Sequence, residues 1–95
     1  MTDKDIMNKA IDHYGTTAQT YMLMEECAEL IQAVSKYNRK CEGSKNLMEE
    51  IADVEIMIEQ VKMILERDGY KNCRQEVQEI KSWKLDRLER RLNNE

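Results

Sequence analysis

Proline and phenylalanine are absent from this 95-residue sequence, glycine occurs three times, and histidine and tryptophan occur once each. Because residues that break helices or form turns are so scarce, long helices with few connections are favoured over a β-sandwich or an open α/β sheet. The single histidine, His13, excludes a di-iron carboxylate bundle, which requires Glu-x-x-His on two helices. A P-loop site is also excluded, because the sequence contains no glycine-rich GxxxxGK segment.

Excess basic charge and long apolar runs are missing too. The formal net charge is −4, whereas a protein that binds a nucleic-acid backbone is normally basic, so we expect no nucleic-acid polymer as a partner. The N-terminal residues are polar and no apolar run approaches membrane length, which argues against a signal peptide or a membrane-spanning segment. Cys27, Cys41 and Cys73 are odd in number and form no CxxC motif. We therefore expect reduced thiols and a cytoplasmic location.

The sequence does contain four segments with apolar residues at helical spacing, which we assign to a single domain spanning residues 1–95. We expect helices over residues 3–14, about 16–41, about 45–68, and from about 73 to the C-terminus. The expected punctuation is Asp3 and Thr16 or Thr17 as N-caps, Gly15 and Gly69 as stops, and a turn at Glu42-Gly43-Ser44. Because such short connections favour antiparallel neighbours, the predicted fold is an all-α four-helix antiparallel bundle: a short N-terminal helix, two long core helices and a C-terminal helix.

The third predicted helix is apolar on two sides. Its main stripe contains Leu47, Ile51, Val54, Met57 and Ile58, and the opposite side carries Ala52, Ile56 and Met63. A helix with two apolar sides is usually buried on both. The second cover is either another subunit, which predicts a homo-oligomer, or the first or fourth helix of the same chain; periodicity does not decide between them.

Two acidic motifs lie on the two long helices. They are Glu25-Glu26-Cys27-Ala28-Glu29 and Glu50-Ile51-Ala52-Asp53, and each places two carboxylates three residues apart on one helix face. Glu26 and Glu50 fall inside the apolar stripes, with Glu29 and Asp53 at their edges. Carboxylates directed at a core are costly unless they are paired or bound to metal.

If the two pairs face each other with oxygens about 5 Å apart, each like-charge pair costs on the order of 3 kcal/mol at an effective dielectric near 20. Either protons or a divalent cation can relieve this repulsion. All the candidate donors are oxygens, which suit Mg²⁺ or Mn²⁺ better than zinc. Magnesium commonly holds a substrate phosphate, polarises a phosphoryl oxygen and generates hydroxide from bound water. The sequence thus predicts metal-assisted chemistry on a phosphate compound.

The spacing of EExxE, followed about twenty residues later by ExxD on helices of a small all-α protein, resembles that of the MazG-like all-α nucleoside triphosphate pyrophosphohydrolases. The resemblance spans roughly residues 17–90. It includes the surrounding Ala28-Glu29-Leu30 and Ile51-Ala52-Asp53-Val54. A weaker part is Lys84-Leu85-Asp86-Arg87, which is similar to a Lys-Phe-x-Arg stretch of many family members.

This resemblance implies Mg²⁺-dependent hydrolysis of a nucleoside triphosphate to the monophosphate and pyrophosphate, by dimers or tetramers of helical subunits. Carried over by position, it implies these roles: metal ligands Glu26, Glu29, Glu50 and Asp53; an outer-shell acceptor or base at Glu25 or Glu49; and phosphate contacts from Lys84 and Arg87. Glu55 and Met57 stand where many members have an aromatic residue, histidine or asparagine near the nucleoside. The base preference is therefore left open.

Three alternatives compete with this interpretation. Phosphoribosyl-ATP pyrophosphohydrolase has a similar size and motif but usually carries a Tyr-His pair soon after ExxD, where this sequence has Glu55-Ile56-Met57. A non-enzymatic interaction module or metal-binding bundle is a second alternative, although an inactive relative would be expected to lose one of the four acids. For Lys84 the alternative role is packing, with its stem along apolar surface and its ammonium in water.

Overall fold

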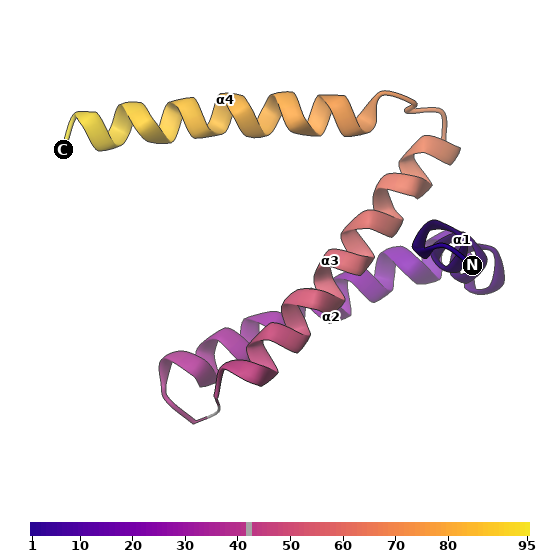
Figure 1. Ribbon diagram of the computed structural model, residues 1–95, viewed down its shortest axis with the longest axis horizontal. Coiled ribbons are helices and arrows are strands. Elements are labelled where there is room, and N and C mark those ends of the chain that lie inside the picture. The colour runs from indigo at the N-terminus through magenta and orange to yellow at the C-terminus, as the bar shows by residue number, and fades with distance from the viewer. Residues whose placement is uncertain (42) are drawn as a thin grey trace. The chain divides into compact units, whose positions relative to one another are not determined.

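The computed structural model describes residues 1–41 and 43–95, and within these ranges it contains four helices and no strand. They are α1 (Asp3–Tyr14), α2 (Thr16–Asn38), α3 (Ser44–Arg67) and α4 (Cys73–Asn93) (Figure 1). The all-α prediction and the order of the helices are confirmed. None of these helices, over the described residues, is long and apolar enough to cross a bilayer. The chain divides into two compact units, Met1–Ile64 and Leu65–Glu95.

The predicted N-caps of α1 and α2 are wrong. Thr2, not Asp3, caps α1: its hydroxyl accepts a hydrogen bond from the Asp5 backbone N–H at 3.1 Å, and its own N–H donates to the Asp5 carboxylate at 3.0 Å. This reciprocal capping box also holds the pKa of Asp5 below its ordinary value. Gly15 ends α1 as predicted, with φ at +94°, and it directly precedes Thr16 in α2, so no threonine side chain caps that helix.

The C-terminus of α2 lies earlier than predicted. Lys40 adopts a left-handed conformation with φ at +59°. Its N–H donates to the Tyr37 carbonyl at 3.0 Å, and the Cys41 N–H donates to the Lys36 carbonyl at 2.9 Å. This pair of bonds is a Schellman motif, formed here by lysine instead of the expected glycine. Of the predicted turn, Glu42 lies outside the described residues, and Ser44 is already the first residue of α3.

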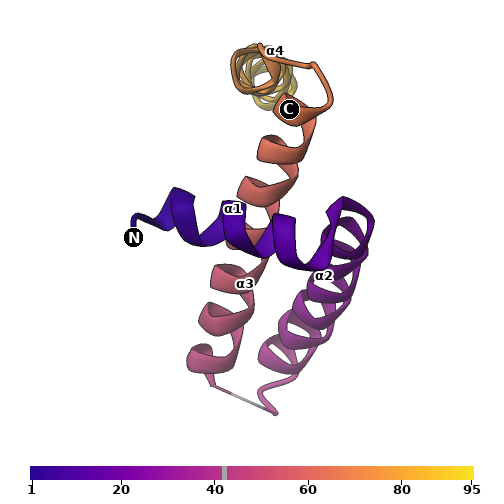
Figure 2. The ribbon, with the colours of Figure 1, turned by 90° about the vertical axis from the view of Figure 1, so that its right-hand side faces the viewer.

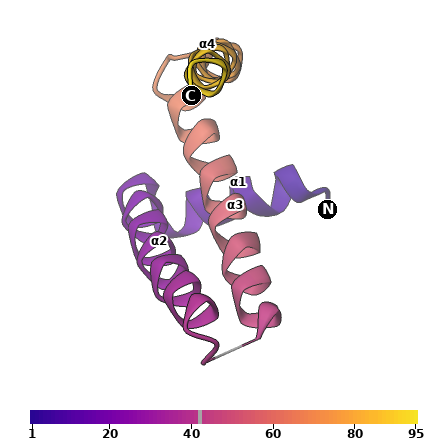
Figure 3. The same ribbon diagram turned by 90° about the vertical axis from the view of Figure 1, so that its left-hand side faces the viewer.

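In the first unit, α2 and α3 run antiparallel and side by side, and α1 crosses them (Figures 2 and 3). Ile11 of α1 is 1% exposed and clusters with Met63 and Ile64 of α3, with Met7 packed against the group. Helix α1 therefore covers the second apolar side of α3 at Met63. At Ile56 that side remains half exposed, so the intrachain cover is partial.

The second unit begins with the last turn of α3. Gly69, with φ at +103°, ends this helix as predicted: its N–H donates to the Glu66 carbonyl and the Tyr70 N–H donates to the Leu65 carbonyl. Arg74 pairs with the Glu66 carboxylate at 3.2 Å, and Cys73 is buried. Beyond Val77 every residue of α4 is exposed within the chain.

Candidate metal centre

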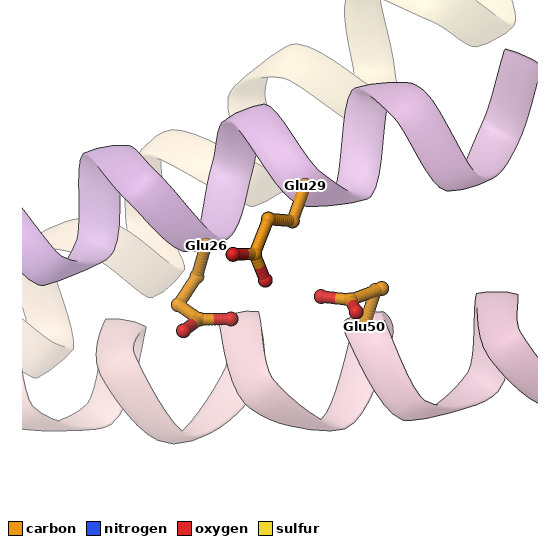
Figure 4. A group of neighbouring side chains, drawn as sticks. All are labelled: Glu26, Glu29 and Glu50. Carbon is orange, nitrogen blue, oxygen red and sulfur yellow. The ribbon is translucent and has the colours of Figure 1, made fainter.

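The antiparallel α2–α3 hairpin brings glutamates from both helices to one point. Glu26 and Glu29 extend from α2 toward α3, and Glu50 extends back from α3 (Figure 4). One carboxylate oxygen from each of the three lies within 4.8 Å of the others. The expectation that acids of the two motifs face each other therefore agrees with the geometry.

Two oxygens of this cluster are buried without a hydrogen-bond donor. They are Oε2 of Glu26 and Oε2 of Glu50, which have no partner among the described residues. Both side chains are half-buried, whereas Glu29 is exposed. A buried acceptor that lacks a donor normally costs free energy, and such groups are rare in folded proteins. Buried oxygens of this kind need either a proton or a cation.

The electrostatic surroundings lead to the same requirement. Loss of hydration raises the pKa of Glu26, and the charges of Glu29, Asp53 and Glu50 raise this pKa further. For Glu50 the order is similar: desolvation contributes most to its raised pKa, followed by Glu29, Asp53 and Glu49. The unliganded site therefore holds protons more tightly than isolated glutamates do.

Asp53 belongs to the same group although it is exposed. The negative charge of Asp53 is among the causes that raise the pKa of both Glu26 and Glu50. Asp53 thus acts electrostatically on this site, whereas Glu26, Glu29 and Glu50 are the residues whose oxygens lie within 4.8 Å of one another. Glu25 and Glu49 are exposed neighbours on the same helices.

The predicted phosphate-binding residues lie on α4, in the second unit. Lys84 and Arg87 are both exposed, and the guanidinium carbon of Arg87 lies 5.0 Å from the centre of the Trp83 ring. This cation–π contact orients Arg87 along the helix surface.

Two buried polar residues of the hairpin, Gln19 and Gln60, are not among the residues predicted from the sequence. The Gln19 Nε2 donates to Gln60 Oε1 at 2.6 Å, and both side chains are buried. A signal was available: Gln19 stands seven residues before Glu26, and Gln60 stands seven residues after Asp53. Glutamine is polar, so it did not count toward the apolar stripes.

The donor set fits a hard divalent cation. The three converging glutamates and the neighbouring Asp53 are all carboxylates, the ligands that Mg²⁺ and Mn²⁺ prefer, and none is a nitrogen or sulfur donor. The buried oxygens of Glu26 and Glu50 are acceptors that a cation would satisfy. An all-α hairpin with such a cluster defines a candidate site for metal-dependent chemistry on phosphates.

The comparison with known families agrees with this site. The family model described as the MazG nucleotide pyrophosphohydrolase domain matches residues 15–91. The chain therefore belongs to the MazG nucleotide pyrophosphohydrolase family, and the resemblance found in its two acidic motifs is confirmed. No curated protein and no solved structure is significantly similar to the chain.

Proposed function

We propose that this protein is a Mg²⁺-dependent hydrolase that cleaves a nucleoside triphosphate to the nucleoside monophosphate and pyrophosphate, with Mn²⁺ as a possible substitute for Mg²⁺. Membership of the family supports nucleotide pyrophosphohydrolysis in general. The observation that carries the proposal is the convergence of Glu26, Glu29 and Glu50 from two helices, with two buried oxygens that have no donor among the residues the structure describes.

In this proposal, Glu26, Glu29, Glu50 and Asp53 hold the metal. When bound, such a cation polarises phosphoryl oxygens and lowers the pKa of water. The negative charge of the four carboxylates repels the phosphates unless a cation lies between them. The triphosphate would therefore lie beside the cluster only when the metal is bound. Glu25 or Glu49, both exposed beside the cluster, would accept a proton from the attacking water or a hydrogen bond from a ligand.

Lys84 and Arg87 are the proposed phosphate contacts. Lysine and arginine are the cationic side chains that proteins use to bind phosphates, and a guanidinium can bind phosphate oxygens in a bidentate manner. The ring of Trp83 limits the freedom of Arg87, which lowers the entropy that Arg87 loses on binding.

We also propose that the active form is a homodimer or homotetramer. Large apolar side chains remain exposed on all four helices; they include Ile6 of α1, Met24 and Ile31 of α2, Ile51, Ile56 and Ile58 of α3, and Ile80, Leu85, Leu88 and Leu92 of α4. Soluble monomers rarely expose so much apolar surface, and a chain this short gains much from a second copy. Sedimentation equilibrium would test this: a mass of 11.3 kDa at all concentrations contradicts it.

The proposed compartment is the cytoplasm, because Cys27, Cys41 and Cys73 form no disulfide within the described residues and reducing compartments preserve thiols.

The activity is tested by incubating the purified protein with a panel of ribo- and deoxyribonucleoside triphosphates and phosphoribosyl-ATP. Chromatography then measures nucleoside monophosphate, and a coupled assay measures pyrophosphate. We expect both products in equal amounts with Mg²⁺, and none after addition of EDTA. Turnover of phosphoribosyl-ATP alone would identify the histidine-pathway activity instead. If no substrate is cleaved with either Mg²⁺ or Mn²⁺, the interaction module becomes the better interpretation.

A further inference from the structure

The buried glutamine pair is unusual for the interior of a helical hairpin. Gln19 and Gln60 are 6% and 5% exposed, and their single shared hydrogen bond of 2.6 Å joins α2 to α3. Burial of an amide is unfavourable unless it finds a partner, and an apolar pair of the same shape is often at least as stable. Stability alone therefore does not account for two glutamines at this point.

Their position along the helices relates them to the acidic cluster. Gln19 precedes Glu26 by seven residues, and Gln60 follows Asp53 by seven. Seven residues are about two turns, or about 10.5 Å, and return to nearly the same helix face. In an antiparallel pair, each step forward along α2 corresponds to a step back along α3. The alignment that places Gln19 against Gln60 therefore also places Glu26 against Asp53 and Glu29 against Glu50.

Other alignments of the two helices are not equally excluded by the rest of the interface. The neighbouring buried or half-buried residues are mostly aliphatic (Leu23, Leu30, Ala33, Val54 and Met57), and such side chains find new apolar contacts after a shift. The glutamines do not, because a shift of one turn leaves two buried amides without each other. The same shift moves Glu50 by about 5.4 Å along α3, more than the 4.8 Å that now spans the glutamate oxygens.

We propose that Gln19 and Gln60 are positioning residues whose buried hydrogen bond fixes the axial register of α2 against α3 and so holds the two acidic pairs opposite each other. A single buried polar pair has the same role in coiled coils, where it specifies register at a cost in stability. The inference rests on the proposed function, since it assigns to this pair the alignment of the metal ligands.

The test uses the full chain with the double substitution Gln19→Met and Gln60→Met, which keeps side-chain length and removes both amides. Three quantities are measured: the thermal unfolding midpoint in EDTA, the number of amide resonances of the metal-free protein, and the Kd for Mn²⁺ by calorimetry. We expect a midpoint equal to or above that of the wild type, more than one set of resonances for α2 and α3, and a Kd weaker by about tenfold or more.

The matched control is Met63→Ala, which removes packing between α1 and α3 and leaves both glutamine side chains in the sequence. It should lower the midpoint yet keep one set of resonances and the wild-type Kd. If the glutamine pair has only a structural role, the affinity for Mn²⁺ should instead follow stability, so that the less stable of the two variants binds Mn²⁺ more weakly. A double variant with one set of resonances and the wild-type Kd would overturn the proposal. The Gln19→Leu and Gln60→Leu pair repeats the test if the methionine pair does not fold.

Failure of the proposed function is recognised separately. If the wild type itself binds neither Mn²⁺ nor Mg²⁺, the metal site is contradicted whatever the variants do. The resonances of the metal-free double variant then decide the register inference alone: several sets support it, and one set overturns it.

Discussion

Charged residues lie within apolar stripes in two regions of this molecule, the α2–α3 hairpin and α4. Only in the hairpin does the local structure give a reason for their position. In the α2–α3 hairpin, part of each stripe is buried, at Ala33 of α2 and at Val54 and Met57 of α3. The glutamates inside these stripes converge, and Glu26 and Glu50 each have a buried oxygen without a hydrogen-bond partner among the described residues. On α4, Lys84 and Arg87 stand among apolar side chains that are all exposed within the chain. A charge in a covered stripe must be compensated where it stands, whereas a charge in an uncovered stripe can remain hydrated. The acids of the hairpin therefore support a metal site by their own geometry. The cations of α4 are assigned to phosphate binding only by the family resemblance.

Removal of one of the proposed metal ligands in the hairpin should have the largest effect on activity. We expect Glu50→Gln to reduce turnover by about 100-fold or more, because the amide lacks the charge that holds a hard cation. The metal-free variant should unfold at the same temperature as the wild type or higher, since repulsion with Glu29 and Asp53 is relieved. Steady-state kinetics and circular dichroism measure both effects. Glu89→Gln, on the exposed surface of α4, is the control for loss of one negative charge. Loss of helicity in Glu50→Gln would instead identify a structural glutamate.

On α4, the corresponding change should have a smaller effect. We expect Lys84→Ala to raise KM or lower kcat by about tenfold, while the Kd for Mn²⁺ stays within about twofold of the wild type. Lys81→Ala removes an exposed cation one turn away and should leave the kinetics unchanged. If Lys84→Ala also leaves the kinetics unchanged, the role of Lys84 is packing, and α4 does not contribute this residue to the active site.

The pH dependence of stability should distinguish the hairpin from an ordinary acidic surface. The pKa values of Glu26 and Glu50 are raised in the folded state, so the folded protein binds more protons than the unfolded chain between the ordinary value of 4.5 and the raised values. Stability from this source is therefore fully present below pH 4.5 and is lost as the pH rises through the folded pKa. Urea unfolding in EDTA at several pH values measures it.

Two comparisons isolate that pH effect from the other carboxylates. Glu26→Gln and Glu50→Gln should each show a smaller loss of stability with rising pH than the wild type. Saturating Mn²⁺ should abolish the loss in the wild type, because a cation that binds only the folded state stabilises it. A wild-type profile that matches the two variants would contradict the raised pKa values.

The smallest expected effect concerns the end of α2. Lys40→Gly should stabilise the protein by about 0.5–1 kcal/mol, since glycine adopts a positive φ without the steric cost that lysine meets. The Kd for Mn²⁺ should not change, because the register of the hairpin is maintained elsewhere. Chemical denaturation measures the gain, and destabilisation would show that the lysine side chain has contacts that outweigh its backbone strain.

Periodicity and helix breakers were sufficient to predict four helices and most of their ends. They failed where local side-chain or backbone interactions decide a helix end. Thr2 caps α1 in place of Asp3 because it forms a reciprocal capping box with Asp5, and Lys40 takes the left-handed conformation expected of a glycine. The cover of α3 was also undecided from sequence. Met63 packs in a buried cluster with Ile11, but Ile56 remains half exposed. Helical periodicity shows which faces are apolar but not which element packs against them.

The candidate site was more predictable, because acids inside apolar stripes are visible in the sequence. Spacing of three residues and the antiparallel hairpin placed the glutamates correctly. The glutamine pair was not predicted, since a hydrogen bond between residues so far apart in sequence depends on register. The relation of Lys84 and Arg87 to the acids stays a prediction from family resemblance.

The three thiols have a practical consequence for experiments. Cys41 is exposed, Cys27 is half-buried and Cys73 is 4% exposed. An alkylating reagent in excess should therefore modify them in that order, and Cys73 should react only when the structure around it opens. Mass spectrometry of timed samples would thus report local opening at the start of α4 without any introduced label.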